Sequence, residues 1–131
     1  MFTALSGFCQ CKVDFTNPAA VGTFILNAIK ENNVSAFKCT FNRVNRSKSI
    51  NEKEFMQECI KFTEGVSKIT EIRRYDKRKG VVWMLCKLKV IENEMMVITL
   101  SLENEKYLFE DINSPGVSEY EKLPLIDIHQ E

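Results

Sequence analysis

The first half of the chain carries apolar residues at helical spacing. Asn17-Pro18 is typical of a helix start, with Asn as the N-cap and Pro in the first turn. The apolar positions that follow, at steps of three and four, predict a helix that ends near residues 31–33. They are Val21, Phe24, Ile25, Ala28 and Ile29.

Two further helices are expected before residue 67. A short one covers residues 34–41, where Phe37 and Phe41 lie on one face. Residues 42–49 are polar and basic and predict a loop. Ser49 or Asn51 then caps a third helix, whose apolar stripe has the width of a core-facing surface. The stripe consists of Phe55, Met56, Cys59, Ile60, Phe62 and Val66.

After Ser67 the apolar period changes to two, which is typical of strands. Four strands are expected, over residues 69–76, 81–92, 95–103 and 106–112. The links between them are short and polar, so consecutive strands must pair as hairpins in an antiparallel meander. One face of the two central strands is uniformly apolar and is expected to carry the helices. The fold class is therefore α+β, with N-terminal helices packed on a curved antiparallel meander.

This order of elements resembles the NTF2-like superfamily, a cone-shaped α+β fold shared with ketosteroid isomerases. The likeness covers about residues 17–113. It rests on helices followed by a long curved hairpin sheet, and on a last strand, Glu105-Lys106-Tyr107-Leu108-Phe109, that resembles the "Gly-Lys-Trp-Lys-Ile" phrase of the family with Tyr107 in place of Trp. The short strand that many members carry between the second and third helices is not evident.

The resemblance implies a cone between helices and sheet that serves as an active site, a ligand pocket or a filled core, and an outer sheet face that often forms a homodimer. The residues expected to line an apolar ligand pocket are Phe24, Phe37, Phe55, Met84, Met96 and Tyr107. A filled core is the alternative for these side chains. A homodimer is expected because the outer face mixes apolar with polar groups. Its expected residues are Trp83, Leu85, Val97 and Thr99.

The five cysteines match no disulfide framework, which favours free thiols in the cytoplasm. A secreted or lipid-anchored protein is the alternative if the true N-terminus lies upstream. No apolar run is long enough for a membrane span. The pair Cys9 and Cys11 lacks the further ligands that a zinc site needs, so no metal and no cofactor are expected.

Charge is unevenly distributed. The formal net charge is zero, but residues 103–131 hold eight acids and two bases, a net of −6, and the rest of the chain carries +6. The expected basic patch consists of Arg73, Arg74, Lys77, Arg78 and Lys79, and a second basic cluster of Arg43, Arg46 and Lys48. If adjacent, the two would attract an acidic protein partner or a phosphate. Nucleic acid is an unlikely partner for a chain with no net positive charge. Alternatively, the acidic tail folds back on the basic hairpin and shields it.

No catalytic residue is expected. The only histidine, His129, lies in the tail, where it is a poor candidate for a positioned base.

The order of elements and the charge distribution favour three segments: residues 1–16, an α+β domain over 17–113, and an acidic tail over 114–131. The favoured function is non-enzymatic binding of a protein partner or a small apolar ligand. The alternatives are a lyase or isomerase that uses Asp76 or Asp111, and a toxin-neutralising or inhibitory protein.

Overall fold

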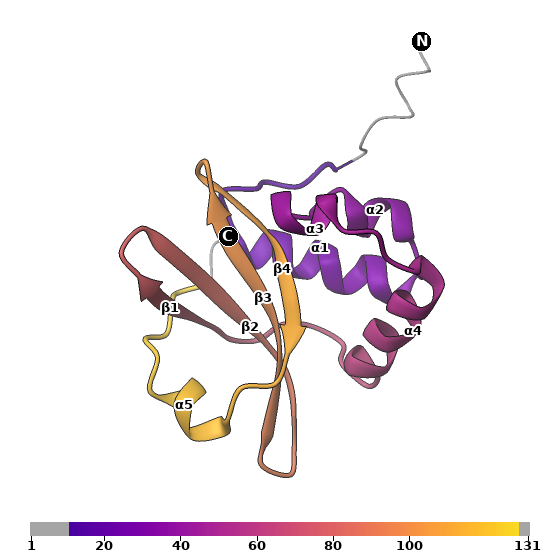
Figure 1. Ribbon diagram of the computed structural model, residues 1–131. Coiled ribbons are helices and arrows are strands. Elements are labelled where there is room, and N and C mark those ends of the chain that lie inside the picture. The colour runs from indigo at the N-terminus through magenta and orange to yellow at the C-terminus, as the bar shows by residue number, and fades with distance from the viewer. Residues whose placement is uncertain (1–10, 129–131) are drawn as a thin grey trace.

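A computed structural model describes residues 11–128 and has the expected α+β architecture (Figure 1). Four helices come first, and a four-stranded sheet follows them. Near the end of the chain a short helix, α5, lies on the other side of the sheet (Figure 1). The N-terminal helices are α1 (Pro18–Lys30), α2 (Val34–Lys38), α3 (Arg43–Ser47) and α4 (Glu52–Thr63).

Asparagine begins each of these four helices. The Asn17 side chain accepts hydrogen bonds from the backbone of Ala19 and Ala20, as the Asn-Pro signal predicts. The Asn33 side chain caps α2 by accepting a hydrogen bond from the backbone of Ala36. Asn42 caps α3 in the stretch that was expected to be a loop, and Asn51 caps α4.

The sheet is an antiparallel meander in the order β1-β2-β3-β4, as expected. Its strands are β1 (Ile72–Arg78), β2 (Val81–Ile91), β3 (Glu94–Glu103) and β4 (Lys106–Asn113). The turn between β3 and β4 consists of Asn104 and Glu105, both with positive φ, as a two-residue hairpin of the primed type requires. Gly80 fills the corresponding role after β1, with φ of 79°.

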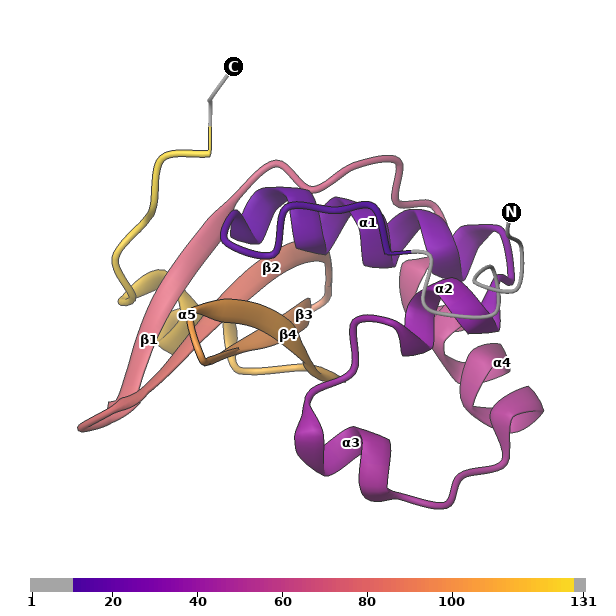
Figure 2. The ribbon, with the colours of Figure 1, turned by 90° about the horizontal axis from the view of Figure 1, so that it is seen from above.

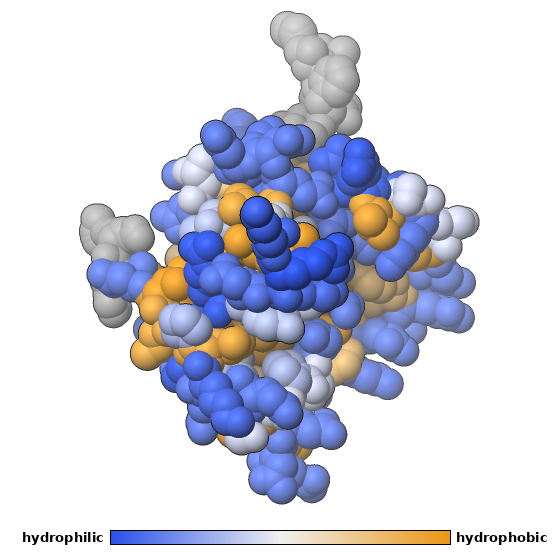
Figure 3. Space-filling model, turned by 60° about the vertical axis from the view of Figure 1, so that its left-hand side comes forward, coloured by the Kyte–Doolittle hydropathy of each residue, from blue (hydrophilic) through white to orange (hydrophobic). Residues whose placement is uncertain are grey.

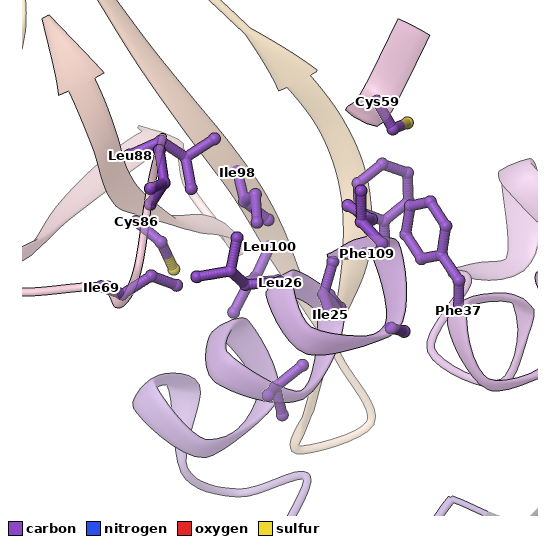
Figure 4. Close-up of a cluster of buried hydrophobic side chains, with 14 of the residues drawn as sticks. Ile25, Leu26, Phe37, Cys59, Ile69, Cys86, Leu88, Ile98, Leu100 and Phe109 are labelled. Carbon is purple, nitrogen blue, oxygen red and sulfur yellow. The ribbon is translucent and has the colours of Figure 1, made fainter. Parts of the chain in front are cut away.

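The main core lies between the helices and the inner face of the sheet (Figure 4). Ile25 and Leu26 of α1 are fully buried against the inner face, where Cys86, Ile98 and Leu100 point toward them. These strand residues belong to the apolar face that the period of two predicted. Figure 2 shows the same arrangement from above, with α1 lying across the sheet.

The outer face of the sheet is covered in part by the chain itself. Helix α5 (Val117–Glu121) places Tyr120 against Leu85, Met95 and Val97, and together these four form a second small core. The expectation that the outer face exposes a dimer surface is therefore wrong for Leu85, Val97 and Thr99, which are buried. Trp83 is half-buried at the rim of this core. The dimer itself is not tested by this burial, but the exposed apolar face that motivated it is occupied.

A bulge at Leu88 changes which side chains of β2 face the helices. The pairing passes from Lys87–Val97 to Lys89–Met96, so one residue of β2 has no partner in β3. Beyond the bulge Lys89 faces α4, where its ammonium group donates to the carbonyl oxygens of Lys61 and Glu64. The period of two places Val90 on the same apolar face as Cys86, but Val90 is exposed. A strict period of two cannot anticipate this reversal.

The cysteines only partly match the expectation of free thiols. Cys59 and Cys86 are free and buried, and burial raises the pKa of each thiol to about 12. Cys11 and Cys39 form a disulfide between the segment before α1 and the end of α2. Cys9 and His129 lie outside the described residues. Disulfides are more usual in oxidising compartments, so the cytoplasmic prediction loses the free-thiol argument behind it.

The segment after β4 is not a detached tail over its described part. Residues 114–123 run across the outer face, and Ile126 and Ile128 pack against the main core. The chain therefore passes around the β1 edge from one face of the sheet toward the other. No helix within residues 11–128 is long and apolar enough to cross a membrane.

Candidate partner-binding surface

The β1–β2 hairpin ends in a group of aromatic and basic side chains, all of them exposed except Trp83, which is half-buried. Tyr75 and Trp83 pair across the two strands, with ring centroids 5.9 Å apart in an edge-on arrangement. The Lys77 ammonium lies 4.2 Å from the centre of the Trp83 ring, within range of a cation–π interaction. We call Tyr75, Lys77, Arg78, Lys79 and Trp83 the hairpin surface. In Figure 2 the turn of this hairpin lies at the far left, away from α2, α3 and α4.

The expected basic patch divides into two parts with different surroundings. Arg74, Lys77, Arg78 and Lys79 are exposed. Arg74 pairs with Asp76 at 2.9 Å, and both side chains are largely open to water, so this ion pair stabilises little. Figure 3 views this side of the molecule and shows strongly hydrophilic side chains beside orange apolar areas. The exposed bases are available to a partner.

Arg73, in contrast, holds the C-terminal segment in place. Its guanidinium donates to the carbonyl oxygens of Glu121 and Leu123, at 3.1 and 2.7 Å, and pairs with Glu71 at 2.9 Å. It also lies 5.1 Å from the centre of the Tyr120 ring. Desolvation alone would raise the pKa of Glu71, but the hydrogen bond and charge of Arg73, together with contributions from the Tyr120 hydroxyl and the Lys87 charge, outweigh it and lower that pKa. Arg73 is thus part of the internal packing and not of the exposed patch.

The acidic segment does return to β1, as one of the sequence hypotheses proposed, but it does so through its backbone. The N–H of Arg74 donates to the carbonyl oxygen of Pro124 at 2.9 Å, and the N–H of Ile126 donates to that of Ile72 at 3.0 Å. The described contacts reach only as far as Arg74. The expected shielding is therefore wrong for the hairpin surface, whose basic side chains stay exposed.

The second basic cluster lies at the same end of the sheet, beside β4. Arg43 and Arg46 of α3 line a surface hollow of about 530 Å³ together with Lys106, Leu108 and Glu103. The cross-strand row Tyr75–Trp83–Ser101–Leu108 connects the hairpin surface to this hollow across all four strands. Lys106 was missed as a site residue. The alternation of β4 and the adjacent hairpin turns were the signals that could have found it.

The expected pocket residues lie mainly in packed regions. Phe37, Met84 and Met96 are buried in the main core, Phe55 and Tyr107 pack against it, and Phe24 is half-buried. The Phe37 ring contacts those of Phe41, Phe55 and Phe109, with centroids 5.2, 5.6 and 4.8 Å away. An apolar ligand between these rings would require them to move apart.

The carboxylates considered for catalysis are both exposed. Asp76 is paired with Arg74 at the hairpin, and Asp111 lies on β4. Partial desolvation raises the pKa of Asp111, but this residue does not line an enclosed cavity among the described hollows. Within residues 11–128, no cluster of three potential ligands is arranged to hold a metal ion.

Comparisons of the chain with protein families, with curated proteins and with solved structures find no match.

Proposed function

We propose that this α+β domain is a non-enzymatic binding module that takes an acidic segment of a protein partner on the hairpin surface. The observation that carries the proposal is the pair of exposed Tyr75 and half-buried Trp83, with Lys77 against the Trp83 ring and Arg78 and Lys79 beside it. Aromatic and basic side chains in one place supply both contact area and charge for an acidic partner.

The charge distribution supports an acidic partner. The hairpin surface carries three bases, and Arg74 compensates the nearest acid, Asp76. An acidic chain that approaches the hairpin therefore meets a positive potential that steers its encounter. The Arg43, Arg46 and Lys106 hollow lies at the same end of the sheet and extends the positive region toward β4.

The proposal can be tested with polyglutamate as a defined acidic probe. We expect saturable, salt-sensitive binding that shifts the NMR signals of Tyr75, Lys77 and Trp83. The triple variant Lys77→Glu, Arg78→Glu, Lys79→Glu should abolish it, because the variant reverses the charge of the surface. The matched control is Lys53→Glu, Lys61→Glu, Lys68→Glu, which makes the same change of charge at exposed positions elsewhere. Equal losses in the two variants would mean that only net charge matters, and the proposal would then be wrong.

The structure agrees to different degrees with the other hypotheses drawn from the sequence. Membership of the NTF2-like superfamily stays a prediction that agrees with the order of helices and strands. An apolar ligand in the cone is less favoured, because the Phe37 ring is packed among three others. A homodimer through the outer face would have to displace α5, whose Tyr120 is buried.

Two alternatives lose their support. A lyase or isomerase needs an enclosed carboxylate, and Asp76 and Asp111 are exposed. An inhibitory protein with a free acidic tail needs that tail to be available, whereas residues 117–126 are packed on the sheet. Deleting residues 117–131 would expose the second core and would not test the role of the acidic charge.

A further inference from the structure

We infer that the acidic partner binds as an added β-strand on the exposed part of the β1 edge. This inference rests on the proposed function and names the way in which the hairpin surface is used. The free edge begins where the chain's own C-terminal segment stops pairing with β1.

The stopping point is Pro124. Arg74 donates its N–H to the carbonyl oxygen of Pro124, but proline has no N–H to return to the carbonyl oxygen of Arg74. From there the chain leaves the edge, because Leu123 packs into the second core on the outer face. As far as residue 128, the C-terminal segment therefore pairs with β1 only from Ile72 to Arg74.

Beyond this point, backbone groups of β1 face away from β2. In an antiparallel ladder the N–H and C=O of alternate residues point to the same side, and Ile72 and Arg74 use that side to bind the C-terminal segment. The carbonyl of Arg74 and the N–H and carbonyl of Asp76 consequently point outward as well. Within residues 11–128, no backbone group of another segment bonds to them. They can hydrogen-bond to an incoming extended chain.

The side chains beside this edge indicate which kind of chain would bind there. A strand added here would run beside Lys77, Arg78 and Lys79, so it must be acidic. The Tyr75 ring, which is more than one third exposed, gives it an apolar contact. A second copy of this chain is a poor occupant of the edge, since two β1 edges would bring their basic side chains together.

The test uses the full chain and a peptide of alternating Glu and Val with blocked ends. Its control is the same peptide with its three central residues N-methylated, which keeps the charge and removes the backbone donors. We expect the control to bind about tenfold more weakly, a change worth roughly one backbone hydrogen bond or slightly more. We also expect the unmodified peptide to slow hydrogen exchange of the Asp76 amide.

A protein variant provides an independent readout. Asp76→Pro removes the outward N–H at a position where an edge strand tolerates proline, and Asp76→Ala is its control. The proline variant should bind the unmodified peptide about tenfold more weakly than Asp76→Ala does, because both variants lack the Asp76 carboxylate and only the proline lacks the N–H. Thermal unfolding of both variants checks that they fold, and the peptide comparison on the native chain does not depend on that check.

The outcomes separate the two proposals. If the two peptides bind equally and the Asp76 amide is unchanged, or if only polyglutamate binds, strand addition is wrong and the basic hairpin surface stands. If neither peptide nor polyglutamate binds, the proposed function fails and this inference fails with it.

Discussion

The two edges of the sheet are treated very differently by the rest of the chain. Along β4, the N–H groups of Tyr107 and Phe109 donate to the carbonyl oxygens of Phe15 and Thr40. Asn42 and Asn45 then bond to the carbonyl oxygen of Phe109. Along β1, the described part of the C-terminal segment makes two backbone bonds, and it joins the edge only from Pro124 onward.

The contrast suggests a division of roles, in which the β4 edge stabilises the fold and the β1 edge is the one that we propose for binding. The β4 edge is covered from Tyr107 to Glu110, and two of the covering residues, Thr40 and Asn42, are almost inaccessible to water. Covering an edge in this way prevents pairing with other chains. The β1 edge is left open where basic and aromatic side chains gather. The open edge, and not the cone, is therefore the part of the sheet that we assign to binding.

The largest effect is expected where the sealed edge meets the core. Phe109→Ala removes a buried ring that contacts Phe37, Phe41 and Phe55 and should lower the free energy of unfolding by about 3–5 kcal/mol. Urea denaturation measures the change. Val44→Ala, at an exposed position on α3, should stay within about 0.5 kcal/mol. A loss below about 1 kcal/mol for Phe109→Ala would show that the ring cluster is not the anchor of this edge.

The next effect concerns the polar closure of the β4 edge. The Asn42 side chain caps α3 and donates to Ser101 at 3.1 Å and to Glu110 at 2.7 Å. Asn42→Ala should cost about 2–3 kcal/mol, because a cap and two largely buried hydrogen bonds are lost together. Hydrogen exchange of the β4 amides should rise, while exchange of the β1 amides should not. Equal changes at both edges would contradict the separation drawn above.

The contacts that cover the sheet edges are also the part of the fold that the sequence could not predict. Asn17-Pro18 and the period of two after Ser67 are local signals, and they predicted α1 and the meander well. The α3 cap at Asn42 depends on contacts with residues about sixty positions away, and no local pattern reports them. No local pattern reports the position of Tyr120 either: the sequence placed it in an acidic tail, but its side chain is buried in the second core. The basic hairpin was visible because charge and turn lie in one short stretch, whereas the open edge beside it required the position of Pro124.

A smaller effect is expected at the half-covered β1 edge. Arg73→Ala removes the donors to Glu121 and Leu123 and the partner of Glu71, and should cost about 1–2 kcal/mol. Because the folded chain lowers the pKa of Glu71, the corresponding stabilisation is complete above about pH 4.5 and is lost as the pH falls further. The variant should therefore lose stability less steeply below pH 4.5 than the native chain does. Parallel pH profiles would contradict the role of this pair.

The smallest effect is expected at Tyr120, under the C-terminal segment. Its hydroxyl is buried and makes no hydrogen bond of standard geometry among the described residues, although the Glu71 carboxylate lies close enough to help burial raise the pKa of this hydroxyl. Tyr120→Phe should thus leave the free energy of unfolding unchanged or raise it by up to about 1 kcal/mol. Calorimetry on both proteins measures the shift. A clear loss of stability would mean that the hydroxyl holds α5 in place.

The Leu88 bulge places two consecutive residues of β2, Leu88 and Lys89, on the side of the sheet that faces the helices. Deleting Leu88 would leave Lys87 opposite Val97 and Lys89 opposite Met96, so every later side chain would keep its side and the strand would become regular. The cost of this deletion is therefore expected at the buried Leu88 side chain, which belongs to the main core, and not in a rearranged surface. A deletion elsewhere in β2 would instead turn every later side chain to the opposite face, so the bulge is the position where this strand best tolerates a change of length.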